Sequence, residues 1–90
     1  MFEIGDVVLT QAPAKDRATG LLAYASFTLD RVLQVDGIAV RRTRDGRLAL
    51  SWPNRTDSRG RRHPFLRPKN DVARVEIERA IIAAVGVLPE

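Results

Sequence analysis

Apolar and polar residues alternate most regularly between residues 21 and 29. The apolar residues recur at every second position, at Leu21, Ala23, Ala25, Phe27 and Leu29, with Tyr24, Ser26 and Thr28 between them. A period of two is that of a strand with one buried face. The segment is therefore predicted to be a half-buried β-strand. Phe27 then belongs to the core, and Tyr24 lies on the outer face or at a subunit contact.

A second strand follows after a tight turn at Asp30-Arg31. Leu33 and Val35 share one face of it, but the next apolar pair, Ile38 and Val40, begins three residues later. A β-bulge at 36–37, where the sequence is Asp-Gly, would return that pair to the core face. The alternative is a break in the strand at the same place.

The segments around these two strands alternate less clearly. An opening strand is expected near residues 2–11, followed by a polar surface loop over 12–20. The Asp-Gly pair within 44–47 predicts a hairpin turn, and Leu48, Leu50 and Trp52 then alternate as far as Pro53. Residues 54–62 contain no apolar side chain and are expected to form an exposed, mobile loop. Phe65 and Leu66, which lie between two prolines, suggest a short edge strand.

The last quarter of the chain has helical spacing. Asn70 or Asp71 can cap a helix that runs to about Val85, with Gly86 as the C-terminal cap and Pro89 beyond it. One side of this helix is apolar, formed by Ala73, Ile77, Ala80, Ile81, Ala84 and Val85. Arg74 and Glu78 can pair on the polar side. The order predicts one α+β domain over residues 1–90, a meander of four to five strands with a C-terminal helix covering one sheet face.

Composition narrows the class of protein. Ninety residues with 44% apolar side chains suit one small folded domain. The chain has no cysteine, which excludes disulfides and thiolate metal sites. We expect no signal peptide, because no basic region followed by an apolar run opens the chain, and no membrane span, because no apolar stretch is long enough. A cytoplasmic location is the expectation.

The charge of the chain is concentrated in one segment. Thirteen of the fifteen basic residues are arginine, and ten of the fifteen lie between Arg41 and Lys69. Only Asp45 and Asp57 oppose them there, so this segment is formally +8, whereas the rest of the chain is −4. Arginine suits bidentate contacts to phosphate, so nucleic acid is the first candidate partner. The alternatives are a solvated surface with no binding role and a polyanionic protein partner.

The order of several motifs resembles the SpoVG (stage V sporulation protein G, septation protein) family. The resemblance rests on the runs 25–30, 32–35 and 38–40, the hairpin at Gly46, the strand ending at Pro53, the basic loop with Arg55 and Gly60, the Arg67-Pro68 step and the helix with Arg74 and Ile77. It covers roughly residues 20–85. The chain departs from the family where Trp52-Pro53-Asn54-Arg55 replaces Met-Pro and Ser-Lys-Arg, and where Arg67-Pro68 replaces His-Pro.

This resemblance implies a divergent member of the family, a small α+β fold, a homodimer built through the sheet, and DNA or RNA binding as a bacterial regulator. A role in septation or sporulation is not carried over. Binding by the family maps by position onto Arg55 and Arg74, and less directly onto Arg67 and Lys69.

The predicted nucleic-acid site combines the arginine-rich loop with the N-terminal end of the helix. Its residues are Arg55, Arg59, Arg61, Arg62, Arg67, Lys69 and Arg74. Trp52 either completes the core or stacks on an unpaired base. The sequence leaves open whether the hairpin arginines Arg41, Arg42, Arg44 and Arg47 lie on the same side as the loop.

No catalytic site is expected. His63 is the only histidine and has no carboxylate or nucleophile at a recognisable spacing, and no phosphate-binding glycine loop is present. We expect no enzymatic activity, no cofactor and no metal. The rival interpretation is a non-enzymatic dimeric scaffold whose basic face docks an acidic protein.

Overall fold

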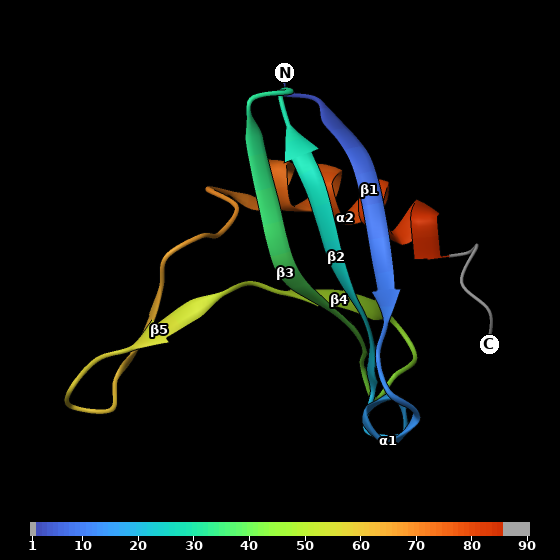
Figure 1. Cartoon of the computed structure of the whole chain (residues 1–90), viewed down its shortest axis with the longest axis vertical. Helices are drawn as coiled ribbons and strands as arrows, with labels where there is room; N and C mark the ends of the chain where they lie inside the picture. Colours follow the sequence, from blue (N-terminus) through green and yellow to red (C-terminus); the bar gives the residue numbers. More distant parts are fainter. Residues whose placement is uncertain (1, 86–90) are drawn as a thin grey trace.

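A computed structural model describes residues 2–85. Four strands form an antiparallel meander in the order β1 (Ile4–Gln11), β2 (Leu21–Leu29), β3 (Leu33–Arg42) and β4 (Leu48–Ser51). A short helix, α1 (Ala14–Arg17), lies between β1 and β2. The helix α2 (Asp71–Val85) lies across one face of this sheet (Figure 1). The predicted α+β class and the sheet meander are therefore confirmed.

A second sheet consists of two short strands, β5 (Asn54–Thr56) and β6 (Arg62–Pro64). This hairpin projects from the end of β4, away from the four-stranded sheet (Figure 1). The radius of gyration is 13.6 Å, whereas a compact domain of this length has about 12 Å. The excess fits a body with a protruding hairpin.

The core lies between α2 and the inner face of β2 and β3. Phe27 and Ile38 are almost wholly buried there against Ile81 of the helix. Tyr24 lies on the opposite, outer face of β2 and is 43% exposed. β2 therefore buries alternate residues and α2 buries its apolar side, as the sequence predicts.

Bulges in β3 and β1 keep the apolar residues on the inner face, and a further register shift falls between Leu21 and Ala23 of β2. In β3, Asp36 and Gly37 together stand opposite the single position between Ala25 and Phe27 of β2, and Gly37 has φ of 74°. Val35 and Ile38 are consequently both buried, so the predicted bulge is confirmed and a strand break is excluded. In β1 a similar shift falls between Gly5 and Val8. The sequence pattern had not suggested this second bulge.

The two predicted hairpin turns and the helix start agree with the sequence, and Gly46 of the β3–β4 turn has φ of 85°. Asp30 and Arg31 have φ of 51° and 61°, and the Val32 N–H donates to the Leu29 carbonyl at 3.0 Å, as a two-residue hairpin turn requires. Asn70 caps α2, because its Oδ1 accepts the Ala73 N–H at 2.9 Å. The expected cap at Gly86 and the stop at Pro89 lie outside the described residues.

Four expectations are wrong. Residues 54–62 are not a loop throughout, because residues 54–56 pair with 62–64 as two short strands although no side chain is apolar. Phe65 and Leu66 lie beyond β6 rather than in a strand. The segment 12–20 contains the short helix α1, and its Ala12 is buried. Leu33 is 58% exposed although it shares the face of Val35, because it lies beside the β2–β3 turn, at the end of the sheet.

Candidate nucleic-acid interface

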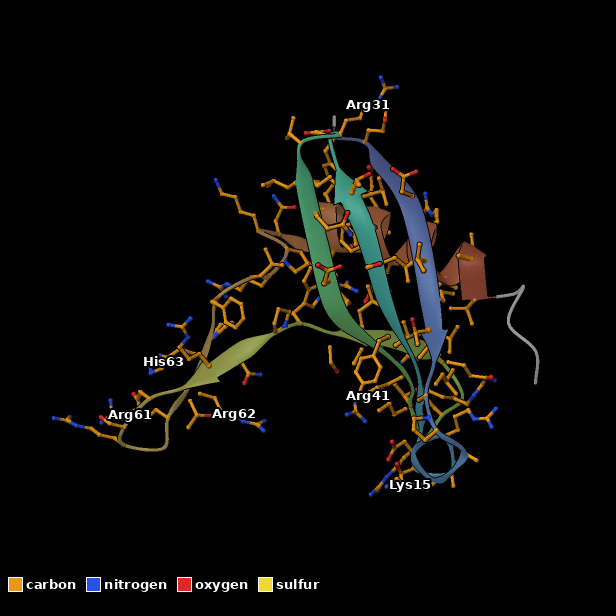
Figure 2. The ribbon with its side chains drawn as sticks, in the orientation of Figure 1. Lys15, Arg31, Arg41, Arg61, Arg62 and His63 are labelled. Carbon is orange, nitrogen blue, oxygen red and sulfur yellow. The ribbon has the colours of Figure 1, made fainter. Side chains whose placement is uncertain are left out.

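The projecting hairpin carries four of the predicted binding residues. We call residues 54–64 the arm. Arg55 lies in β5 opposite His63, and Arg62 lies in β6 opposite Thr56. Arg59 and Arg61 lie in the turn between the strands. The fold therefore brings these arginines together on one narrow element, which Figure 2 shows extending from the body.

Asp57 organises the turn of the arm. Its Oδ1 accepts the backbone N–H groups of Arg59 and Arg61, both at 2.9 Å, and its Oδ2 lies 2.7 Å from Nε2 of His63. Gly60, with φ of 80°, supplies the left-handed position that closes the turn. The hydrogen bond from His63, followed by the backbone N–H of Arg61, holds the pKa of Asp57 below its ordinary value of 3.8. The only acid of the arm is thus occupied within it.

The basic side chains of the arm and of the segment leading to α2 are exposed and have no carboxylate partner within residues 2–85. They are Arg55, Arg59, Arg61, Arg62, Arg67 and Lys69. With Asp57 as the single acid between 54 and 69, the segment is formally +5. Because these cations are exposed and have no carboxylate partner, they can approach an external polyanion without first breaking an ion pair.

Arg74 differs from the other predicted residues. Its Nε lies 3.4 Å from Asp71 and its Nη1 lies 2.7 Å from Glu78. The pair with Glu78 is the predicted one, and the second carboxylate further neutralises the guanidinium. An incoming phosphate would have to compete with both acids, so Arg74 is the weakest member of the predicted set.

Phe65 is a candidate that the sequence interpretation missed. It follows the arm directly and is 61% exposed, and the Arg55 guanidinium lies 5.7 Å from its ring centroid. That separation is within the range of a cation–π contact. An exposed aromatic ring beside unpaired arginines can stack on a base. The sequence did contain a signal for this exposure, because Phe65 lies between Pro64 and Pro68, and prolines disfavour a place inside a sheet.

Trp52, the other aromatic candidate for base stacking, differs from Phe65. It is half-buried and packs against the core cluster of the sheet and α2. Of the two interpretations offered for Trp52, the packing favours completion of the core.

The hairpin arginines form a separate surface. The β3–β4 turn precedes β4 and the arm follows it, and in Figure 2 Arg41 lies on the body of the protein, whereas Arg61 lies at the outer part of the arm. Arg47 in that turn pairs with Asp45 at 2.9 Å. The basic segment of the sequence is therefore two surfaces, one on the arm and one at the opposite end of β4.

Comparisons with known proteins add no family assignment: no protein-family profile and no curated protein matches the chain. Among residues 2–85, no three acidic, histidine or cysteine side chains gather as a metal site would require. No helix in this described part of the chain is long and apolar enough to cross a membrane.

Proposed function

We propose that the protein is a non-enzymatic nucleic-acid-binding module of regulatory function, and that it binds through the arm. The observation that carries the proposal is that the arm and the segment leading to α2 are exposed and hold six cations without a carboxylate partner in the described chain. An exposed phenylalanine, Phe65, lies where the arm meets that segment. The cations supply salt-dependent attraction to phosphates. The resemblance to the SpoVG family points to the same class of partner.

The exposed ring favours unpaired bases over duplex. Phe65 can stack on one base, which is typically worth about 1–3 kcal/mol, whereas the bases of a duplex are already stacked on one another. Arg55 above the ring adds a cation to the same position. We therefore propose single-stranded DNA or RNA as the preferred ligand. Arginine contacts phosphates as well as guanine edges, so the described residues identify no sequence preference, and modest specificity is expected.

The test is a comparison of two variants with the same change in charge. In the first, Arg55, Arg59, Arg61 and Arg62 are replaced by Gln. In the second, the replaced residues are Arg41, Arg42, Arg44 and Arg47. Binding to 5′-hydroxyl oligonucleotides is measured by fluorescence anisotropy at several salt concentrations. The first variant should lose most of its affinity and the second should lose little, although net charge falls equally in both.

The salt dependence tests the number of contacts. If all six unpaired cations meet phosphates, log affinity should fall with log salt with a slope of about −4 on single strands and about −5 on duplex. Absence of binding to any DNA or RNA at ~50 mM salt would refute the proposal and leave an acidic protein as the partner. Equal losses in the two quadruple variants would refute the assignment to the arm.

A homodimer is part of the proposal. Val8 and Tyr24 lie on the sheet face away from α2 and are 58% and 43% exposed. A second copy packed on this face would bury both side chains and place two arms on one assembly, which raises affinity through bivalence. Light scattering should then give twice the 10.0 kDa chain mass, and Val8→Asp should return it to the monomer. A monomeric wild type would refute the dimer without affecting the arm.

A further inference from the structure

A cavity of about 290 Å³ lies at the end of the sheet that is remote from the arm. It forms where the loop after α1 meets the start of the β3–β4 turn, and its walls include Arg17, Gly20, Arg42 and Arg44. Its volume is near the lower end of the range for small-molecule sites. Residues 17–20 and 42–44 are far apart in the sequence, so only the folded sheet creates this cavity.

The lining is strongly cationic. Three arginines contribute to it, and no carboxylate does. The nearest acid of the turn, Asp45, is occupied by Thr43 and by Arg47 at 2.9 Å. None of the three lining arginines takes part in an ion pair within residues 2–85. Three guanidinium groups without a carboxylate at one opening make the cavity attractive to an anion.

One of these arginines, Arg17, also has a hydrogen-bond donor without an acceptor. The Nε of Arg17 is buried and has no hydrogen-bond partner in the described chain. A buried N–H without an acceptor is unfavourable, and such groups are rare in folded proteins. Neither threonine of the wall, Thr19 or Thr43, accepts a hydrogen bond from this group. The guanidinium of Arg17 is thus left with hydrogen-bonding capacity that the described chain does not use.

The floor of the cavity is held in place by the backbone. The Arg42 N–H donates to the Gly20 carbonyl at 2.8 Å, which ties the α1 loop to β3. A Cβ on Gly20 would lie 2.9 Å from the Arg42 carbonyl oxygen, and φ of this residue is 101°. Only glycine permits this close approach. The site is therefore formed before any ligand arrives.

We infer that this cavity binds a phosphate group, the terminal phosphomonoester of a small ligand or of a nucleic-acid end. A phosphomonoester carries more than one negative charge near neutral pH and offers three acceptor oxygens, which matches several guanidinium groups better than a carboxylate does. The inference does not rest on the proposed function, because it concerns other residues at the other end of the molecule.

The experiment is a titration of the ¹⁵N-labelled protein with inorganic phosphate and with a nucleoside 5′-monophosphate, against sodium chloride at equal ionic strength. Phosphate should shift the amide signals of Thr19, Gly20 and Thr43 in a saturable way, and chloride should not. Arg17→Gln and Arg44→Gln should each weaken binding by about tenfold or more, the loss expected for a charge-assisted hydrogen bond. Arg44 is exposed, so its variant remains informative if the Arg17 variant does not fold.

Arg31→Gln is the matched control, because Arg31 lies at the opposite end of the sheet and pairs with Glu3 at 3.0 Å (Figure 2). It should bind phosphate as the wild type does. Unsaturable shifts spread over all basic residues would overturn the inference. So would undiminished binding by both pocket variants.

The source of the phosphate is distinguished by oligonucleotides that differ only at one end. Tighter binding of a 5′-phosphorylated strand than of its 5′-hydroxyl form, lost in Arg44→Gln, would assign the cavity to a nucleic-acid end. Equal binding of the two strands, with saturable binding of the free nucleotide, would assign it to a small phosphorylated ligand. The quadruple arm variant should keep phosphate binding in either case, so failure of one assignment is separable from failure of the other.

Discussion

The Asp57 carboxylate accepts hydrogen bonds from two backbone N–H groups and from His63, so folding of the arm favours its charged form. Because its pKa is lowered in the folded protein, the stability that it contributes is complete above the ordinary value of 3.8. That contribution declines as the pH falls below 3.8 and through the lower folded pKa. The amide signals of Arg59 and Arg61 should therefore titrate with a midpoint below 3.8. A midpoint at or above that value would contradict the prediction, and Asp57→Asn should abolish the step.

Two phenylalanines of this chain should respond oppositely to truncation. Phe27 is 1% exposed and Phe65 is 61% exposed. Phe27→Ala removes the largest fully buried side chain and should cost about 3–5 kcal/mol, a large part of the total stability of so small a domain. Phe65→Ala should change stability by about 0.5 kcal/mol or less while weakening single-strand binding. Urea denaturation and anisotropy measure the two effects, and a Phe65 variant that binds normally would remove the ring from the interface.

At the scale of elements, the β3 bulge determines which residues reach the core. Deletion of Gly37 would shorten the spacing from Val35 to Ile38 to two residues, so both would keep the core face and remain opposite Phe27 and Ala25 in a regular ladder. Ile38 and Val40, which are fully buried now, would stay buried, so the deletion variant should still fold cooperatively. Gly37→Ala keeps the register and should cost only about 1–2 kcal/mol for its positive φ. Circular dichroism melting curves measure both effects, and a deletion variant that fails to fold would show that the bulge itself is required.

The start of α2 allows a similar comparison. Asn70→Ala removes the oxygen that accepts the Ala73 N–H and should cost about 0.5–2 kcal/mol. Asn70→Asp keeps an acceptor and adds a negative charge near the helix N-terminus, so it should be nearly neutral. Equal losses in both variants, measured by urea denaturation, would show that the side chain does not act as a cap.

At the scale of the whole molecule, the body should fold without the arm. None of the core residues lies within 54–64, and the ends of the arm are adjacent, since the Phe65 N–H donates to the Pro53 carbonyl at 3.4 Å. Replacement of the arm by a short Gly-Ser link should therefore leave cooperative unfolding within about 1 kcal/mol of wild type and remove nucleic-acid binding. Loss of folding on removal of the arm would show that it supports the body.

Local pattern was sufficient for the elements that bury apolar side chains. We could predict the alternation of β2, the bulge before Ile38 and the apolar side of α2, because burial imposes a period on the apolar residues of the sequence. The arm could not be predicted in this way. It is held by backbone hydrogen bonds and one aspartate in the turn, so its sequence shows no alternation of apolar residues. The bulge of β1 was missed for a related reason, because only two apolar residues precede it.

The sequence by itself determined the fold class, the core faces and the concentration of arginine, because each depends on composition or on neighbours a few residues apart. Only the tertiary structure decided how those arginines are grouped. It separated the β3–β4 turn from the arm, and it exposed Phe65 beside Arg55. It also brought Arg17 against Arg42 and Arg44 around one cavity. The physical reason is that exposed charged residues follow no regular spacing in the sequence. Which of them become neighbours therefore depends on how the strands and turns are arranged in space.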